Sequence, residues 1–226
     1  MKPEERSRRS FATTIGAALA FTLGSRAAGA QGRATKFQPA RHAPDAWLDA
    51  LPGRHRTVID ASTVNGGETA MLYAFNMYES NKVGYSLPDR DVAVVVCLRH
   101  TATSFAFNDA IWAKYGKSLN TPMQLTDPKT KQPPTTNLLL SVDYGLDLPN
   151  FGVTIEELVK RGTRFAVCDM ATRGAAGSIA MDTKGDFETI YKELVANLIP
   201  SSRMVTAGVL AVNRAQEYGY TLITAL

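Results

Sequence analysis

The sequence predicts an α/β domain built on a doubly wound, mostly parallel sheet of five strands. Short apolar, β-branched runs alternate along the chain with segments whose apolar residues recur at helical spacing. One run, residues 91–98, is apolar almost throughout, which is typical of a strand buried on both faces of a parallel sheet. The 226 residues, 45% of them hydrophobic, suffice for one domain with a full core.

The predicted strands are short and rich in valine, threonine, isoleucine and phenylalanine. The first is expected to end at Asn65-Gly66-Gly67, because this tripeptide is a turn signal. The third ends at Cys168 and is expected to lead into a turn rich in glycine and alanine. The predicted strands cover residues 56–61, 91–98, 164–168, 204–208 and 220–224.

The predicted helices lie between these strands, as expected for βαβ units. Thr154 and Glu157 form a capping box that begins one of them, and Gly162 ends it. Gly219 ends the last helix in the same way. The predicted helices cover residues 68–82, 103–115, 154–161, 186–198 and 209–218.

The domain spans residues 55–226. One irregular stretch precedes it and a second interrupts it. Residues 31–54 are a lead-in whose apolar end, Trp47, Leu48 and Leu51, is expected to attach to the domain. Residues 117–150 form a Pro-rich insertion with little periodicity.

The insertion carries apolar groups that a plain linker would not need, above all Leu138-Leu139-Leu140. An exposed patch of this kind usually marks a contact surface. Residues 137–149 are therefore expected to pack on the rim of their own domain, as a surface hairpin, or on a neighbouring subunit. Residues 127–134 are expected to stay mobile.

The positive charge of the chain is concentrated at its start. The formal net charge is +4, yet five of the 25 basic and two of the 21 acidic residues lie within residues 1–30, so the remainder carries only +1. Composition therefore gives no case for a nucleic-acid partner. No apolar run reaches the roughly 18 to 20 residues of a spanning helix, so no integral membrane span is predicted.

Residues 1–30 resemble a twin-arginine (Tat) export signal. Arg8-Arg9 precede a weakly hydrophobic stretch, and Ala28-Gly29-Ala30 is a small-x-small cleavage pattern. The resemblance implies cleavage near Ala30 and a periplasmic mature protein beginning near Gln31. A disordered N-terminus or an uncleaved anchor are the alternatives.

Several function classes lack their sequence signals. Two cysteines exclude a disulfide scaffold. The sequence contains no dinucleotide or P-loop glycine motif and no Gly-x-Ser-x-Gly elbow, so no cofactor is predicted.

The candidate site lies where the strands end, because ligands of open α/β sheets bind outside the carboxyl ends of the strands. Cys168 ends a strand before a helix start, where amide groups favour a thiolate, and Arg173 adds positive charge. His100, just past the second strand, is suited to deprotonating a thiol or binding an anion, or is a loop histidine. Cys97 lies within an apolar strand and is expected to be buried there.

A metal site of Cys97, His100 and Cys168 is conceivable from the ligand types, although no fourth ligand is evident. Cys168 could likewise be a small buried residue without a chemical role.

Three parts of the sequence together resemble the DsrE/DsrF-like sulfur-relay family. They are the segment Phe165-Ala-Val-Cys168, the turn at His100, and the ending Gly208-Val209 with Arg214-Ala-Gln-Glu-Tyr-Gly-Tyr220. The resemblance implies a flavodoxin-like, three-layer fold and a homo-oligomer. In some members a cysteine carries sulfur as a persulfide, and that cysteine corresponds to Cys168. This sequence differs from the family pattern at His100-Thr101, where relatives often have His-Gly. It also differs by the insertion at residues 117–150.

Three function hypotheses follow. The first is a periplasmic sulfur carrier or transferase that works through Cys168, with His100 and Arg173 assisting, and exchanges sulfur with a donor or acceptor protein or a small sulfur compound. The second is a non-catalytic binding or assembly module that retains the fold. The third is a metal or haem binder.

Overall fold

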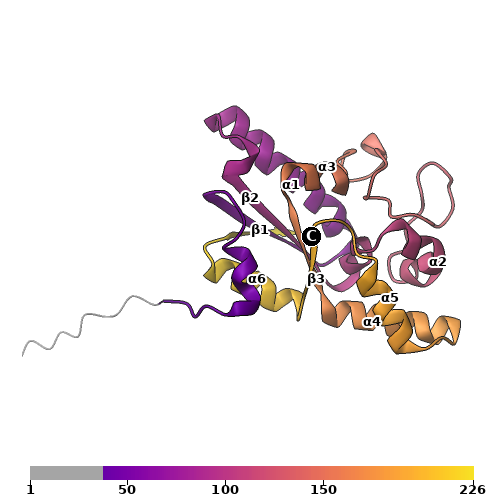
Figure 1. Cartoon of the computed structure of the whole chain (residues 1–226). Coiled ribbons are helices and arrows are strands. Elements are labelled where there is room, and N and C mark those ends of the chain that lie inside the picture. Colours follow the sequence, from indigo (N-terminus) through magenta and orange to yellow (C-terminus); the bar gives the residue numbers. More distant parts are fainter. Residues whose placement is uncertain (1–37) are drawn as a thin grey trace, which may run out of the picture. The chain divides into compact units, whose positions relative to one another are not determined.

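Five parallel strands form a sheet at the centre of the structure, a computed structural model that describes residues 38–226 (Figure 1). Pro39–Leu226 make up one compact unit. The sheet has the order β4-β3-β2-β1-β5, and each neighbouring pair is parallel. The predicted α/β, doubly wound fold is therefore confirmed. The strands are β1 His55–Ala61, β2 Val92–Leu98, β3 Arg164–Cys168, β4 Ser202–Val205 and β5 Thr221–Ala225.

Six α-helices and four short 3-10 helices connect the strands within the described residues. The α-helices are α1 Val64–Tyr85, α2 Asp109–Asn120, α3 Ile155–Arg161, α4 Asp169–Thr183, α5 Phe187–Ala196 and α6 Gly208–Glu217. The 3-10 helices are η1 Ala43–Leu48, η2 Asp89–Asp91, η3 His100–Ala106 and η4 Gly145–Asp147.

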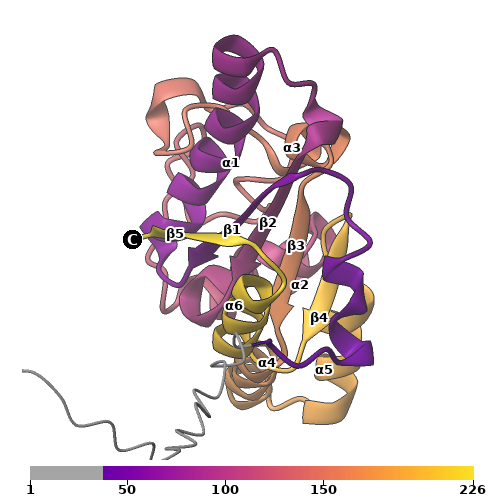
Figure 2. The ribbon, with the colours of Figure 1, turned by 90° about the vertical axis from the view of Figure 1, so that its left-hand side faces the viewer.

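The helices cover the two faces of the sheet unequally. One buried cluster joins Val94, Val96 and Leu98 of β2 to residues of α1 through α5. A second, smaller cluster on the other face joins the alternate residues of β2, such as Val95, to α6 and η1. Figure 2 shows α6 lying in front of the strands, with η1 beside β4. Side chains of β2 point alternately into the two layers, so this strand is buried along its whole length.

The Asn65-Gly66-Gly67 signal lies inside a helix, and the turn prediction at this place is wrong. Thr63 caps α1 by accepting a hydrogen bond from the Gly66 amide at 2.8 Å, so the helix begins four residues before the predicted start. A Cβ at Gly67 would lie 2.6 Å from the Phe105 ring. The glycines are thus needed for close packing and not for a turn.

The Gly/Ala-rich stretch after Cys168 is also helical. It forms α4, so the prediction of a turn here is wrong. Thr172, Ala176 and Ile179 recur at helical spacing and are buried against the sheet. The glycines of this stretch cost some helix stability, but packing of that face outweighs the cost.

The helix predicted over residues 103–115 is two elements, η3 and α2. Asn108 separates them, because its side chain accepts a hydrogen bond from the Ile111 amide at 3.2 Å and so caps α2. The capping box at Thr154 is confirmed in the same way, with the Glu157 amide donating to Thr154 Oγ1 at 3.2 Å. Gly162 ends α3 with a φ of 108°.

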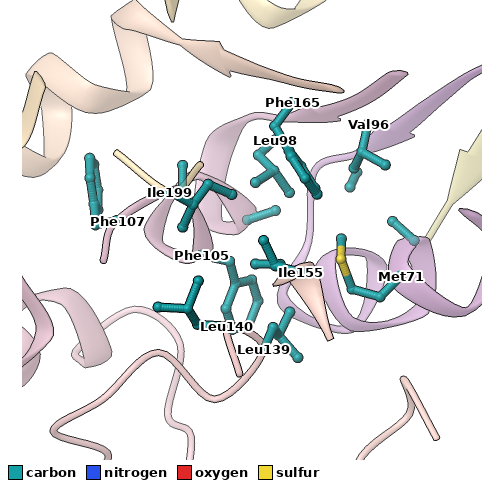
Figure 3. Packing of buried hydrophobic residues seen from close by; sticks show 14 of the residues in the cluster. Met71, Val96, Leu98, Phe105, Phe107, Leu139, Leu140, Ile155, Phe165 and Ile199 are labelled. Carbon is teal, nitrogen blue, oxygen red and sulfur yellow. The ribbon is translucent and has the colours of Figure 1, made fainter. Parts of the chain in front are cut away.

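The insertion belongs to the core of its own domain. Leu138 and Leu139 are fully buried, and Figure 3 shows Leu139 and Leu140 beside Phe105. The side-chain amide of Asn137 donates to the carbonyl groups of Phe105 and Phe107, each at 2.8 Å, and ties the segment to η3. Of the predicted arrangements, packing on their own domain is confirmed, although these leucines complete the core instead of forming an exposed patch at its rim.

Residues 127–134 form a hydrogen-bonded turn where a mobile stretch was expected. The Asp127 carboxylate accepts hydrogen bonds from the amides of Lys129 and Thr130, at 2.7 and 3.2 Å. Its other oxygen accepts one from the hydroxyl of Tyr144 at 3.3 Å. A buried carboxylate with three donors holds this turn in place.

The lead-in attaches to the domain as predicted. Leu48 is fully buried in the α6-side cluster, and Trp47 and Leu51 pack against that cluster. The hydroxyl of Tyr220 donates to the Leu48 carbonyl at 2.8 Å. The export-signal prediction, residues 1–30, lies outside the described residues.

Candidate functional site

Cys168 lies where two neighbouring strands send the chain to opposite faces of the sheet. It is the last residue of β3, and α4 follows on the α1–α5 face. The adjacent strand β4 instead continues into α6 on the other face. Connections that leave adjacent strands in opposite directions open a crevice at their carboxyl ends, which is where α/β sheets bind ligands.

The strand alternation directs the Cys168 side chain toward the α6 face. Phe165 and Val167 belong to the core cluster of the α1–α5 face, and Ala166 belongs to the other. Cys168 is 7% exposed, and its thiol makes no hydrogen bond that caps α4. This cysteine is a free, buried thiol.

Cys97, on the neighbouring strand β2, is the second thiol near this end of the sheet and is fully buried from solvent. It pairs in register with Ala166, so its side chain also points to the α6 face. Its thiol donates to the Gly208 carbonyl at 3.5 Å. Burial raises the pKa of Cys97, and Asp60 and Cys168 raise this pKa further. Cys97 is therefore a buried, protonated thiol, which confirms the predicted burial.

An ion pair that the sequence analysis did not single out borders both thiols. Arg99 follows β2, and its guanidinium binds the carboxylate of Asp60 on β1, with Nε–Oδ1 at 2.7 Å and Nη2–Oδ2 at 2.9 Å. The bond to Asp60 raises the pKa of Arg99, and the nearby thiols Cys97 and Cys168 raise this pKa further. A carboxylate inside an otherwise apolar strand is the sequence signal by which Asp60 could have been found.

The start of α6 lies against Arg99 and Cys97. Ala207, its N-cap residue, provides no side-chain cap, so the first amide groups of α6 lie unsatisfied by a capping side chain at this end of the sheet. A Cβ at Gly208 would lie 2.6 Å from Cβ of Arg99 and 3.2 Å from Sγ of Cys97. Only glycine lets the helix approach the strands this closely.

Arg173 does not join Cys168. It is paired with Asp169 on the same helix, with Nε–Oδ2 at 3.0 Å, and its guanidinium lies 4.2 Å from the ring centre of Tyr191. The Tyr191 hydroxyl also donates to Asp169, at 2.6 Å. The expectation that Arg173 supplies charge to the thiol is therefore not supported by its contacts, and Arg99 occupies that place.

His100 lies apart from Cys168 as well. It begins η3 with a φ of 52°, is exposed, and lines a hollow between η3, α2 and α4 together with Ala171 and Gly174. Cys168 does not line this hollow. Of the residues expected to act with Cys168, neither His100 nor Arg173 contacts it in the described part of the chain; Arg99, paired with Asp60, lies near both thiols.

The arrangement places a guanidinium group, paired with a carboxylate, near the two thiols. Asp60 fixes the orientation of Arg99, since a bidentate pair allows one relative geometry. Within residues 38–226 no three His, Cys, Asp or Glu side chains are grouped as a metal site requires. In the same residues no helix is both long and apolar enough to cross a membrane.

Neither a family model nor a curated protein matches the chain.

Proposed function

We propose that the protein carries sulfane sulfur as a persulfide on Cys168, as its resemblance to the DsrE/DsrF-like family implies. The observation that carries the proposal is the position of this thiol at the carboxyl end of β3, near Arg99. Sulfur transfer proceeds by thiolate attack, so the proposal requires that a sulfur donor can reach this thiol.

The transfer is a thiol exchange without net oxidation. Cys168 loses its proton, and the thiolate attacks the outer sulfur of a donor persulfide, R–S–SH. A bond forms between Sγ and that sulfur while the S–S bond of the donor breaks. The donor leaves as a thiolate, takes up the proton and becomes R–SH. Delivery to an acceptor thiol is the same exchange in the opposite direction.

The surroundings of the thiol suit a protein as donor or acceptor. Met170, two residues after Cys168, and Val209, directly after Gly208, are exposed apolar side chains at the starts of α4 and α6. Leu210 is partly exposed beside them. Exposed apolar groups at these helix starts suit a contact surface for a partner protein.

Export and self-association complete the proposal. The Tat resemblance of residues 1–30 places this chemistry in the periplasm, after cleavage near Ala30. The family resemblance implies a homo-oligomer, but Leu138-Leu139-Leu140 do not provide its contact, because they are buried in their own core.

A cyanolysis assay tests the proposal. The chain is loaded with inorganic polysulfide, freed of excess donor and treated with cyanide, which removes the outer sulfur of a persulfide as thiocyanate. The native protein and the Cys97→Ser variant are expected to release thiocyanate in an amount proportional to the amount of protein. The Cys168→Ser variant is expected to release none. Equal release from Cys168→Ser would refute the proposal.

A binding or assembly module is the second candidate, and the burial of Cys168 favours it. An aromatic disulfide reagent distinguishes the two. A sulfur carrier reacts at Cys168 without denaturant, whereas a binding module reacts only after unfolding in urea. The Cys97→Ser variant ensures that the signal reports Cys168 alone.

A further inference from the structure

A hollow separates η3, α2 and α4 on the face of the sheet opposite α6. Its volume is about 250 Å³. Ser104 and Ser118 form its buried part, while His100 and Gly174 are exposed at its mouth. Cys168 is not among its lining residues, so the hollow is independent of the proposed sulfur chemistry.

The α4 wall of the hollow consists of small side chains. Ala171, Gly174, Ala175 and Ser178 recur with the spacing of one helix face. A Cβ at Gly174 would meet no atom within 4 Å. The space beside this face is therefore open, and no side chain of the described part of the chain fills it.

Two buried hydroxyl groups in the hollow lack partners. Ser104 and Ser118 are 7% and 8% exposed. Within residues 38–226 neither hydroxyl group makes a hydrogen bond; the Ser104 carbonyl accepts one from the indole of Trp112 at 3.1 Å, and the Ser118 carbonyl accepts one from the amide of Thr121 at 3.3 Å. Buried hydroxyl groups are normally satisfied. The hydroxyl groups of Ser104 and Ser118 are not sealed from solvent, so both are available to a molecule that enters the hollow.

The remaining walls define the class of that ligand. Leu119, Pro122 and Ala175 are apolar, and no acidic or basic side chain other than His100 lines the hollow. Ala171 lies in the first turn of α4, where amide groups and the helix dipole favour negative charge. An apolar cavity of about 150 Å³ accommodates benzene. The larger hollow has room for a ring or a branched chain and one head group.

We propose that this hollow binds a small monocarboxylate with an apolar body. The body lies against Leu119, Pro122 and the small side chains of α4. The carboxylate accepts hydrogen bonds from the Ser104 and Ser118 hydroxyl groups and lies near His100 and the amino end of α4.

Benzoate is the test probe, titrated into the full chain and followed by calorimetry and by NMR, with benzyl alcohol as its neutral counterpart. We expect benzoate to bind in a saturable manner and more tightly than benzyl alcohol. Gly174→Leu places a side chain in the hollow and should lower the affinity for benzoate at least about tenfold. Gly177→Leu is the matched control on the same helix, because its Cβ also meets no atom within 4 Å but it does not line the hollow.

The Ser104→Ala/Ser118→Ala double variant should reduce the preference for benzoate over benzyl alcohol. Cys168→Ser should leave benzoate binding unchanged, which separates this proposal from the sulfur chemistry. Absence of saturable benzoate binding, an equal loss in Gly177→Leu, or tighter binding of benzyl alcohol would each overturn the proposal.

Discussion

The guanidinium of Arg99 binds the carboxylate of Asp60 through two parallel hydrogen bonds, at 2.7 and 2.9 Å, directly beside the two thiols of the chain. The pair joins the carboxyl ends of β1 and β2. The two hydrogen bonds fix the orientation of the guanidinium and satisfy the carboxylate. The site is therefore built on rigid strands and not on a loop.

Arg99→Leu should destabilise the protein by about 1–3 kcal/mol, because it leaves the buried Asp60 carboxylate without its partner. Urea denaturation measures the change. The double variant Asp60→Leu/Arg99→Leu should recover part of the loss, since it also removes the unpaired charge. A single variant as stable as the native protein would show that the pair contributes nothing.

Gly208→Ala should destabilise the protein by about 1–3 kcal/mol, because the added methyl group would lie 2.6 Å from Cβ of Arg99. Gly177→Ala is the control: its methyl group meets nothing, and alanine favours a helix interior by about 0.5–1 kcal/mol. The two variants should therefore shift the melting temperature in opposite directions. A shift of the same sign and size in both would contradict the close approach of α6.

Glu68 should make the protein less stable as the pH rises. Burial raises the pKa of Glu68 from 4.5 to about 7. Below pH 4.5 the carboxyl is neutral in both states, and above pH 7 it is charged in both, so the burial cost grows across this window by at most about 3 kcal/mol. Glu68→Gln should remove this part of the pH dependence in denaturation at pH 5 and pH 8. Identical pH profiles for the two proteins would contradict the prediction.

Leu139→Ala should destabilise the protein by about 2–5 kcal/mol without changing its mass in solution, because Leu139 is buried in its own domain. Leu146→Ala in the same insertion is the control, because Leu146 is 84% exposed and its loss should cost less than about 0.5 kcal/mol. A change of oligomeric mass in a folded Leu139→Ala protein would contradict this assignment.

Replacement of Arg8 and Arg9 by lysine should leave the precursor in the cytoplasm. The Tat route reads paired guanidinium groups in the signals that residues 1–30 resemble. Cell fractionation followed by immunoblotting measures the effect. Export that survives the double replacement would show that another route is used.

The strand pattern could be predicted because burial on one or both faces of the sheet leaves a direct trace in the sequence. β2 shows this most clearly, since all seven of its residues are apolar and buried. Glycine was the main source of error. Gly66 and Gly67 indicated a turn, although they serve the close packing of α1 on its neighbours, and α4 tolerates Gly174 and Gly177 within a helix.

The position of Cys168 at a strand end could be predicted, whereas its neighbours could not. The sequence does not show to which side of a strand end a side chain points, so His100 and Arg173 were expected beside a thiol that they do not contact. Arg99 and Asp60 meet only because β1 and β2 are adjacent and in register, with Asp60 opposite Cys97. That relation depends on strand order.

The most direct test of the persulfide on Cys168 is the intact mass of the chain after exposure to inorganic polysulfide under native conditions. We expect a gain of one sulfur atom in the native protein and in Cys97→Ser, no gain in Cys168→Ser, and a slower gain when Arg99 is replaced by glutamine. A native mass that stays unchanged, or a gain that persists in Cys168→Ser, would contradict it.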